Sequence, residues 1–386
     1  MGWQVYDLTR DPLALGLIGL AEALPAIGMS LFAGHVADSH DRRRIALMAL
    51  VALVVCSIGL WILAHPTPLG QTIGSRTRVS AIYAVIVVSG VARAFLQPAR
   101  QALSAELVPR ELFSNSVTWR SGSWQLAAVL GPAIGGVLYA VGGTTVAYAA
   151  DVLLMIVAVS VMASVRHRSP VRDAGAREPI GVSLTSGLRF VFGEPILLSA
   201  LTLDLFSVLF GGATALLPVF AAEILHTGPT GLGMLRAAPA AGAVLTSIAL
   251  TRWPPFKRTG PTLLIAVAGF GACMIGFGLS RSLVLSLVLL AASGAFDMVS
   301  VVIRSLMLQA RTPETLLGRV SSVNQIFIGS SNEIGAFESG VMAKAFGAVP
   351  SVVMGGIATL AVVGVVAWRV PMLRRLRELN VGNAER

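Results

Sequence analysis

The chain has 386 residues, and only 12% of them carry a charge, whereas charged residues make up about 25% of a typical soluble domain. Apolar residues account for 55%, and a further 40 residues are glycine. A soluble protein of this length could not bury so much apolar surface or cover itself with so few charges. The two cysteines exclude a secreted disulfide scaffold, and the hydropathy excludes a disordered chain. The composition therefore predicts a membrane protein that crosses the bilayer many times.

The start of the chain is too short to form a first spanning helix. Residues 1–6 cover only about 9 Å of helix at about 1.5 Å per residue, and Asp7–Pro12 must lie outside the membrane. No basic leader with a cleavage site is present, and Tyr6 stands where a myristoylation signal needs Ser or Thr. We expect a truncated first helix or a misplaced start codon, with an external amino terminus as the alternative.

Apolar stretches of the length that crosses a bilayer, roughly 20 residues, then recur along the chain. They are too long for barrel strands and lack the alternation of a transmembrane β-barrel. The sequence therefore predicts an all-α membrane protein with eleven full spans. The predicted spans are residues 13–34, 45–64, 80–98, 117–141, 144–165, 195–222, 230–251, 260–280, 283–304, 319–345 and 349–369.

The basic residues predict how these spans are oriented. The net charge is +10, but only two of the 29 basic residues are lysines. The arginines cluster at the ends of apolar stretches, as charges that set topology do, so nucleic acid is not an expected partner. Most of them lie on one set of loops and on the tail, which the positive-inside rule places in the cytoplasm. Arg42–Arg44, Arg100 and Arg304 belong to this set, whereas Arg10 and Arg281 lie on the opposite side.

The longest predicted loop, residues 166–194, divides the chain into five full spans before it and six after it. Within it, Leu184, Leu188 and Val191 recur at helical spacing, which predicts a short helix along the membrane surface. The predicted organisation is an amino-terminal bundle over 1–165, a cytoplasmic linker over 166–194, a carboxy-terminal bundle over 195–370 and a basic cytoplasmic tail over 371–386.

The two predicted bundles echo one another. In both, a span ends in an arginine, and a loop proline precedes the next span. The pattern indicates that one bundle arose by duplication of the other. Parallel repeats of six helices are an architecture of secondary transporters. The matched residues, each pair separated by 204 positions, are Gly90 and Gly294, Arg100 and Arg304, Pro109 and Pro313, and Leu112 and Leu316.

Several kinds of catalytic chemistry leave no motif in the sequence. It has no phosphate-binding loop of ATPases, no zinc-binding H-E-x-x-H motif or Cys/His cluster, and no G-x-S-x-G elbow with a histidine partner. Cys56 and Cys273 lie in mid-span, where inert buried thiols are ordinary. We therefore predict a protein that is not an enzyme, binds no cofactor and is not a pump driven by ATP.

Three motifs follow one another in the order found in one transporter family. The loop after the first full span reads G-H-V-A-D-S-H-D-R-R-R from Gly34, a later span holds G-V-A-R around Arg93, and the next holds G-P-A-I-G-G from Gly131. Together they resemble the G-x-x-x-D-x-x-x-R-R loop, the helix 4 arginine and the antiporter G-P-x-x-G-G motif of the major facilitator superfamily.

Two further segments, Gly2–Thr9 and Ser331–Gly340, resemble the enterobactin-exporter-like branch of bacterial proton-driven efflux proteins. The resemblance covers the whole chain. It implies the major facilitator fold, two pseudo-symmetric six-helix bundles, with most of helix 1 missing here. We expect a monomer in the inner membrane of a bacterium, in contact with membrane lipid and with a small-molecule substrate.

The first cytoplasmic loop holds candidate gate residues. Gly34, Asp38, Arg42 and Arg43 belong to its motif, and Asp38 and Arg42 are four residues apart, so on a helix end they would share a face. In the functional interpretation the loop clamps two helices by charge pairs in one state and releases them in the other. In the alternative, the arginines only set the topology.

A candidate helix-packing motif lies in the predicted span 117–141. Its residues are Gly131, Pro132, Gly135 and Gly136. Small residues on one helix permit close backbone approach, which a sliding interface needs, and ordinary helix packing is the alternative.

Ionisable residues inside spans cost about 2.5–3.5 kcal/mol each on insertion scales, so their presence needs a reason. The candidates for a proton carrier are Asp204 and Asp297, with Glu22 and Glu333 behind them. The resemblance places Asp204 and Asp297 in the seventh and tenth helices, which line the family's central cavity. The alternative for each charge is a structural salt bridge or a side chain that reaches the interface. The substrate-cavity candidates are Arg93, Arg236, Gln325 and Asn332, the last two from a polar stripe at helical spacing.

These observations lead to one preferred function and two alternatives. The preferred hypothesis is a secondary transporter that uses the proton gradient to export a small amphipathic molecule by alternating access. By resemblance, that molecule is a siderophore or a drug. The alternatives are uptake by symport and, because helix 1 is mostly missing, a membrane scaffold that does not transport.

Overall fold

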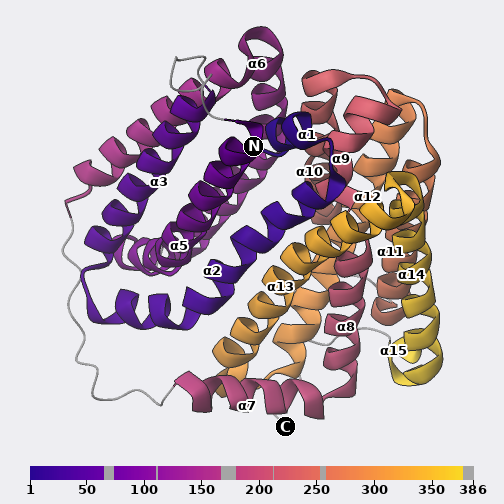
Figure 1. Ribbon diagram of the computed structural model, residues 1–386. Coiled ribbons are helices and arrows are strands. Elements are labelled where there is room, and N and C mark those ends of the chain that lie inside the picture. The colour runs from indigo at the N-terminus through magenta and orange to yellow at the C-terminus, as the bar shows by residue number, and fades with distance from the viewer. Residues whose placement is uncertain (65–73, 110–111, 167–179, 212, 253–257, 377–386) are drawn as a thin grey trace. The chain divides into compact units, whose positions relative to one another are not determined.

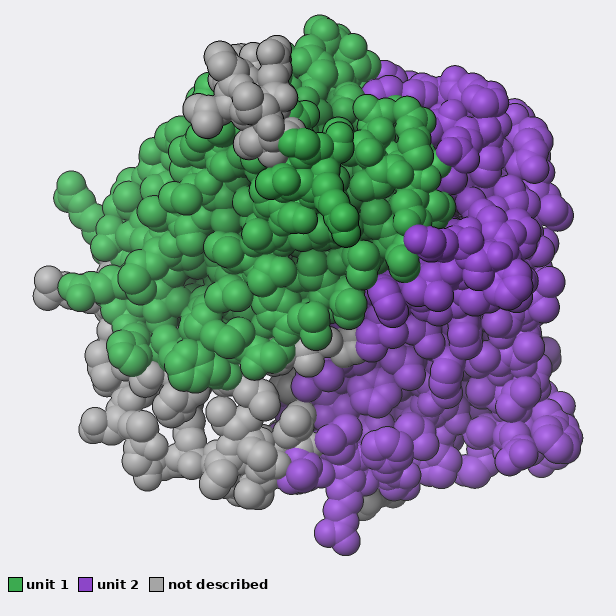
Figure 2. Space-filling model, in the orientation of Figure 1, with its two compact units in different colours: residues 1–177 green, residues 178–386 purple. Residues whose placement is uncertain are grey.

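The computed structural model describes residues 1–64, 74–109, 112–166, 180–211, 213–252 and 258–376. Within these ranges the regular secondary structure is entirely helical (Figure 1). The chain separates into two compact units, residues 1–177 and residues 178–386 (Figure 2). The division falls inside the predicted linker, and each unit is described by itself.

Unit 1 is a set of long helices with one short helix at its start. Helices α2, α3, α5 and α6 make its main contacts, α2 and α3 with α5, and α3 with α6. Its helices are α1 (Gly2–Thr9), α2 (Pro12–Ser39), α3 (Arg42–Ala64), α5 (Ser75–Leu107) and α6 (Phe113–Ser164).

Helix α6 covers two predicted spans with a break between them. Gly142 and Gly143 have non-helical dihedral angles, and the φ of Gly143 is 65°, which glycine adopts without a clash from a Cβ atom. The break lies between the predicted spans 117–141 and 144–165, so the glycine pair is where the chain turns from one span into the next.

Helix α1 is held against unit 1 by polar contacts. The Tyr148 hydroxyl donates to Gln4 Oε1 over 2.7 Å, and both side chains are buried. Val5 and Tyr6 are buried as well, and Asp11 caps the start of α2 by accepting from the Leu13 amide over 3.0 Å. The predicted helix 1 remnant is therefore packed into this unit as an eight-residue helix.

Unit 2 begins with the helix predicted in the linker. Helix α7 packs on α13 and α8, and the Arg319 guanidinium donates to Ser186 Oγ over 3.0 Å. The helices of unit 2 are α7 (Ile180–Gly193), α8 (Pro195–Phe210), the 3-10 turn η3 (Ala213–Leu216), α9 (Leu217–Val219), the π turn η4 (Phe220–Ile224), α10 (Gly228–Arg252), α11 (Thr259–Leu279), α12 (Leu283–Arg311), α13 (Glu314–Phe346), α14 (Ala348–Arg369) and α15 (Pro371–Arg375).

Eight helical segments of the described chain are long and apolar enough to cross a membrane. One of them, Trp119–Ser164, covers nearly all of the two predicted spans 117–141 and 144–165. The predicted spans 13–34 and 319–345 are also helical, as parts of α2 and α13, but are not among these eight. In α2 the described apolar stretch is Pro12–Pro25. The eight are Arg42–Ala64, Ser75–Ser104, Trp119–Ser164, Pro195–Ile224, Gly228–Arg252, Thr259–Leu279, Leu283–Arg311 and Ala348–Arg369.

The long helices expose many large apolar side chains, which would be unfavourable in contact with water. Leu153, Leu154 and Val161 on α6 are each more than 60% exposed. Each unit nevertheless has an apolar interior, and in unit 2 the rings of Phe220 and Phe277 stack with centroids 4.6 Å apart. A chain that is apolar both inside and outside has lipid for its solvent.

Candidate functional site

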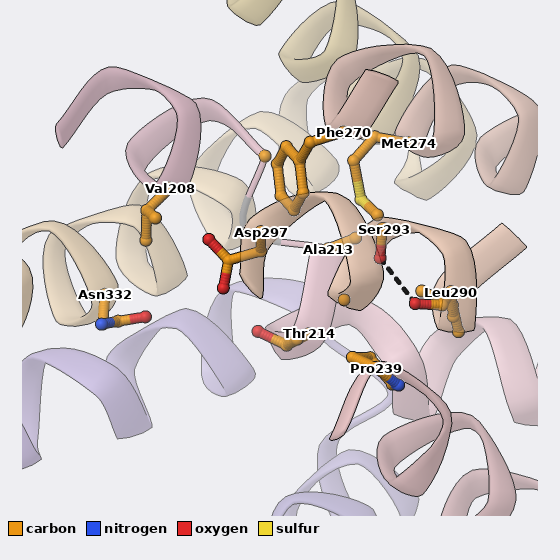
Figure 3. Close-up of a pocket in the computed structure, with 12 residues that line it drawn as sticks. Val208, Ala213, Thr214, Pro239, Phe270, Met274, Leu290, Ser293, Asp297 and Asn332 are labelled. Carbon is orange, nitrogen blue, oxygen red and sulfur yellow. Dashed lines mark hydrogen bonds between the residues drawn. The ribbon is translucent and has the colours of Figure 1, made fainter. Parts of the chain in front are cut away.

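The candidate site is a pocket within unit 2 with a volume of about 180 Å³ (Figure 3). Helices α8, α10, α11, α12 and α13 and the turn η3 all contribute to its wall. Its lining residues are Val208, Gly211, Ala213, Thr214, Pro239, Phe270, Met274, Leu290, Ser293, Gly294, Asp297 and Asn332.

Part of the pocket wall is formed where the span Pro195–Ile224 is not a continuous helix. Helix α8 ends at Phe210, the chain continues through η3, and helical hydrogen bonding resumes at α9. The Gly211 amide donates back to the Ser207 carbonyl over 2.7 Å, and the Ala213 amide donates to the Gly211 carbonyl over 2.7 Å. Irregular backbone at membrane depth is tolerated where it lines a cavity or is covered by protein, and this segment does line the pocket.

Asp297 supplies the one carboxylate among the residues that line this pocket. In Figure 3 its oxygens point toward the space between Val208, Thr214 and Asn332. The Asn332 amide nitrogen donates to the Ile328 carbonyl over 2.9 Å, which leaves its oxygen able to accept. The pocket thus combines an acid, a hydroxyl and an amide with the apolar walls of Phe270 and Met274.

A buried ion pair lies beside the pocket. Asp204 on α8 and Arg304 on α12 form a salt bridge, and they are only 5% and 7% exposed. The Arg304 Nε–H also donates to the Ser300 carbonyl over 3.4 Å. Both members of this pair act electrostatically on Asp297, so the two predicted acids and one arginine form a single charged cluster.

Unit 1 contains a more open ion pair. Glu22 on α2 pairs with Arg93 on α5, and their side chains are 32% and 53% exposed. The helices approach closely here, because a Cβ atom on Gly90 would lie 3.2 Å from the Glu22 carbonyl oxygen. A predicted proton carrier and a predicted cavity arginine are therefore partners.

The gate residues are joined to other helices of unit 1. Arg42 pairs with Glu106, near the end of α5. The Arg43 guanidinium donates to the Ala163 carbonyl over 2.7 Å, near the end of α6, and its backbone amide donates to Asp41 Oδ1 over 3.0 Å. The side chains at positions 34 and 38 lie outside the described residues, so the predicted contact of Asp38 with Arg42 stays a prediction.

The full length of the sequence matches one protein family. Residues 1–384 match the transmembrane secretion effector family of major facilitator transporters. The chain belongs to that family. It is therefore a multi-pass membrane transporter and not an enzyme, and the resemblance stated from its motifs is confirmed.

Two bacterial relatives of this family member are efflux proteins by name. The enterobactin exporter EntS of Shigella flexneri is 26% identical over 380 residues, which cover 97% of this chain and 87% of that protein. The multidrug efflux pump Tap of Mycolicibacterium fortuitum is 26% identical over 396 residues, which cover 99% and 92%.

Solved structures confirm the major facilitator fold. The inward-open xylose transporter XylE from E. coli superposes with a TM-score of 0.68 at 12% identity, over 93% of this chain and 86% of that one. A D-xylose-proton symporter superposes with a TM-score of 0.70 at 13% identity, over 95% and 90%. At such identities the likeness shows the fold alone.

The structure gathers some of the transporter's predicted site residues and leaves others apart. Asp297 and Asn332 line the pocket, whereas Arg236 and Gln325 are exposed elsewhere on α10 and α13 and Glu333 is half-buried on α13. In the glycine motif of α6, Gly136 is buried. A Cβ atom on either of its neighbours Gly131 and Gly135 would meet no described atom within 4 Å, so the packing role of this motif, including Pro132, stays a prediction.

Two residues that the structure places at these sites were not predicted from the sequence as members of them. Arg304 was grouped with the topology-setting arginines, and that grouping is corrected here, because it is buried against Asp204. Glu106 was overlooked as the partner of Arg42. The signal for Arg304 was available, since it lies seven residues after Asp297 and therefore on the same face of one helix.

Proposed function

We propose that this transporter exports a small amphipathic molecule, a siderophore or a drug, in exchange for protons. The observation that carries the proposal is the position of Asp297, a carboxylate in an otherwise largely apolar pocket within the spanning part of unit 2. An intramembrane acid is a functional-site hypothesis by default. The names of the relatives EntS and Tap support export rather than uptake.

The charged cluster offers a way to move a proton. When Asp297 is ionised, Arg304 is attracted both by it and by Asp204; when Asp297 is protonated, Arg304 neutralises Asp204 alone. Among the described groups, Asp204 from α8 and Arg304 from α12 are those that act on Asp297, and α11 contributes no charge. The proton on Asp297 therefore decides how the guanidinium charge is shared.

The walls of the pocket suit an amphipathic ligand. Phe270 and Met274 present polarisable apolar surface, while Thr214 and Asn332 can exchange hydrogen bonds with a polar group (Figure 3). The volume of about 180 Å³ is below the roughly 300–1,000 Å³ of sites that enclose a drug-sized ligand. In this conformation the pocket would therefore hold one end of the substrate.

The test is transport by the purified protein in proteoliposomes with an imposed pH gradient. The probes are ethidium, as an amphipathic cation, and a catecholate siderophore. We expect a gradient to drive at least one probe in the direction opposite to the protons, and Asp297→Asn to reduce that flux at least about tenfold while probe binding survives. The matched control is Asp151→Asn in unit 1, where the carboxylate accepts from Ser57 over 2.6 Å.

Three outcomes would contradict the proposal. Flux in the same direction as the protons would establish symport. Gradient-driven flux at the normal rate in Asp297→Asn would remove this residue as the proton carrier. Absence of any flux from a folded protein that binds neither probe would favour the scaffold alternative.

A further inference from the structure

A short sequence pattern recurs in α2 and α10 and puts opposite charges at equivalent positions. Residues 22–28 read E-A-L-P-A-I-G, and residues 236–242 read R-A-A-P-A-A-G. The alanine, proline and glycine positions of the two segments coincide, with Pro25 matching Pro239. By this match Glu22 of unit 1 corresponds to Arg236 of unit 2.

A second match puts opposite charges on the partner helices. Both α5 and α12 contain a Ser-Gly pair, at residues 89–90 and 293–294, and three residues later stand Arg93 and Asp297. Arg93 therefore corresponds to Asp297. The two units carry ionisable residues at the same pair of positions, with the charges exchanged.

The ion pair at these positions is formed in unit 1 but not in unit 2. Glu22 and Arg93 form an ion pair. Arg236 makes no ion pair or hydrogen bond with any residue that the structure describes, and neither does Asp297. A cation in the interior of an apolar helix such as α10 is costly unless it finds a partner or water. The Arg236 side chain is exposed, so in this structure no described acid holds its charge and the side chain is available to one.

The packing of the helices also differs where Arg236 and Asp297 form no ion pair. In unit 1, Gly90 lies against the Glu22 carbonyl and the Pro25 ring. In unit 2, a Cβ atom on Gly294 would collide with the carbonyl of Pro239, one turn later than Arg236. Helix α12 therefore meets α10 farther along its length than α5 meets α2. This register accompanies the absence of an ion pair between the described residues Arg236 and Asp297.

We propose that Arg236 is a second, alternating partner of Asp297. When α10 slides along α12 by about one turn, roughly 5.4 Å, the helix pair takes the register of α2 and α5, and Arg236 reaches Asp297 as Arg93 reaches Glu22. One-turn ratchets of packed helices are a known form of conformational switching.

The consequence is competition for one carboxylate. In the register of this structure the pocket is open, and Asp297 is available to a proton or to a cationic group of a ligand. In the second register the Arg236 guanidinium occupies that place. Arg236 is thus a positioning residue that returns Asp297 to its ionised, empty state after release.

The test measures the slide directly in the purified full-length protein in lipid nanodiscs. Spin labels replace Thr251, near the end of α10, and Val284, near the start of α12, in a background without Cys56 and Cys273. Because these positions lie at opposite ends of the two helices, a slide changes their separation by nearly the whole displacement. We expect two distances that differ by about 5 Å, the longer one belonging to the paired register.

Charge variants decide whether the ion pair causes the longer distance. Arg236→Gln and Asp297→Asn should each lower the population of the longer distance about tenfold relative to that of the shorter distance. The double variant Arg236→Glu with Asp297→Arg copies the arrangement of unit 1 and should restore it. Arg281→Gln, at an exposed arginine just before α12, is the matched control and should leave both populations unchanged.

A single distance in the unmodified protein would overturn the proposal, as would an unchanged longer population in Arg236→Gln. Loss in both single variants without recovery in the exchanged variant would show that the two charges act separately, which also contradicts a pair. The measurement needs neither substrate nor gradient, so its failure is distinguishable from a failure of the proposed export.

Discussion

The two units handle intramembrane charge differently. In unit 2, Asp204 and Arg304 are almost completely buried against one another, whereas in unit 1 the Glu22–Arg93 pair keeps 32% and 53% of its side-chain surface exposed. A buried pair is costly to break, because the remaining charge cannot be hydrated. An open pair can exchange its partner for water at little cost. The comparison shows that a pair of an acid and an arginine is a permanent structural contact when it is buried, as in unit 2, and a contact that can separate when it is exposed, as in unit 1.

The largest effect is expected from breaking the buried pair on one side only. Arg304→Gln leaves the Asp204 carboxylate buried without its cation, which should lower the free energy of unfolding by about 3–5 kcal/mol. Unfolding of the purified protein by heat or by SDS in detergent micelles measures this. The double variant Asp204→Asn with Arg304→Gln removes both charges and should be less destabilised than Arg304→Gln alone. Equal destabilisation of the two would contradict the role of a stranded charge.

The next effect concerns how closely the helices approach in each unit. A Cβ atom on Gly242 would collide with the Ala291 carbonyl, whereas one on the equivalent Gly28 would meet no described atom within 4 Å. We expect Gly242→Ala to lower the free energy of unfolding by about 1–3 kcal/mol, and Gly28→Ala to be neutral or slightly stabilising, since alanine favours a helix. The same unfolding assay measures both variants. Equal effects would contradict the inference that the helices approach more closely at Gly242 than at Gly28.

A smaller effect is expected at the contact between α3 and α5. Arg42 and Glu106 are 10% and 20% exposed, between the two extremes above. Glu106→Gln keeps the shape but removes the charge, and should lower the free energy of unfolding by about 1–2 kcal/mol. Asp7→Asn, which removes the acid of the exposed pair with Arg10, is the control and should change the free energy of unfolding little. A fall in Glu106→Gln as large as that of Arg304→Gln would show that the contact between α3 and α5 is as fixed as the buried pair.

The smallest effect on stability is expected at the open pair of unit 1. Arg93→Ala should lower the free energy of unfolding by no more than about 1 kcal/mol, because water can hydrate the remaining Glu22 carboxylate. Arg93→Lys keeps the charge without the planar fork of the guanidinium. Its free energy of unfolding should lie between that of the unmodified protein and that of Arg93→Ala. Loss of several kcal/mol in Arg93→Ala would show that this pair is a permanent structural contact as well.

Some of this protein could be predicted from the sequence because the signals are local. A bilayer selects segments of about 20 apolar residues, so the predicted spans could be found one by one. They correspond to helices of the structure, except that the predicted span 195–222 is interrupted after Phe210. The boundary at Gly142 and Gly143 could be predicted too, because two adjacent glycines interrupt an otherwise continuous apolar run. The motifs around Gly34 and Gly131 identified the family for the same reason, since each is contained within one short segment.

Only the tertiary structure decided which charges meet. Arg304 stands at the end of a predicted span and looked like a charge that sets topology, yet the neighbouring helix brings Asp204 to it. Arg42 pairs with Glu106, which is 64 positions away in the chain. Glu22 and Arg93 were placed in separate roles and prove to be partners. Hydropathy fixes that a helix crosses the membrane but not which face it turns toward a neighbour, and ion pairs depend on that rotation and on helix register.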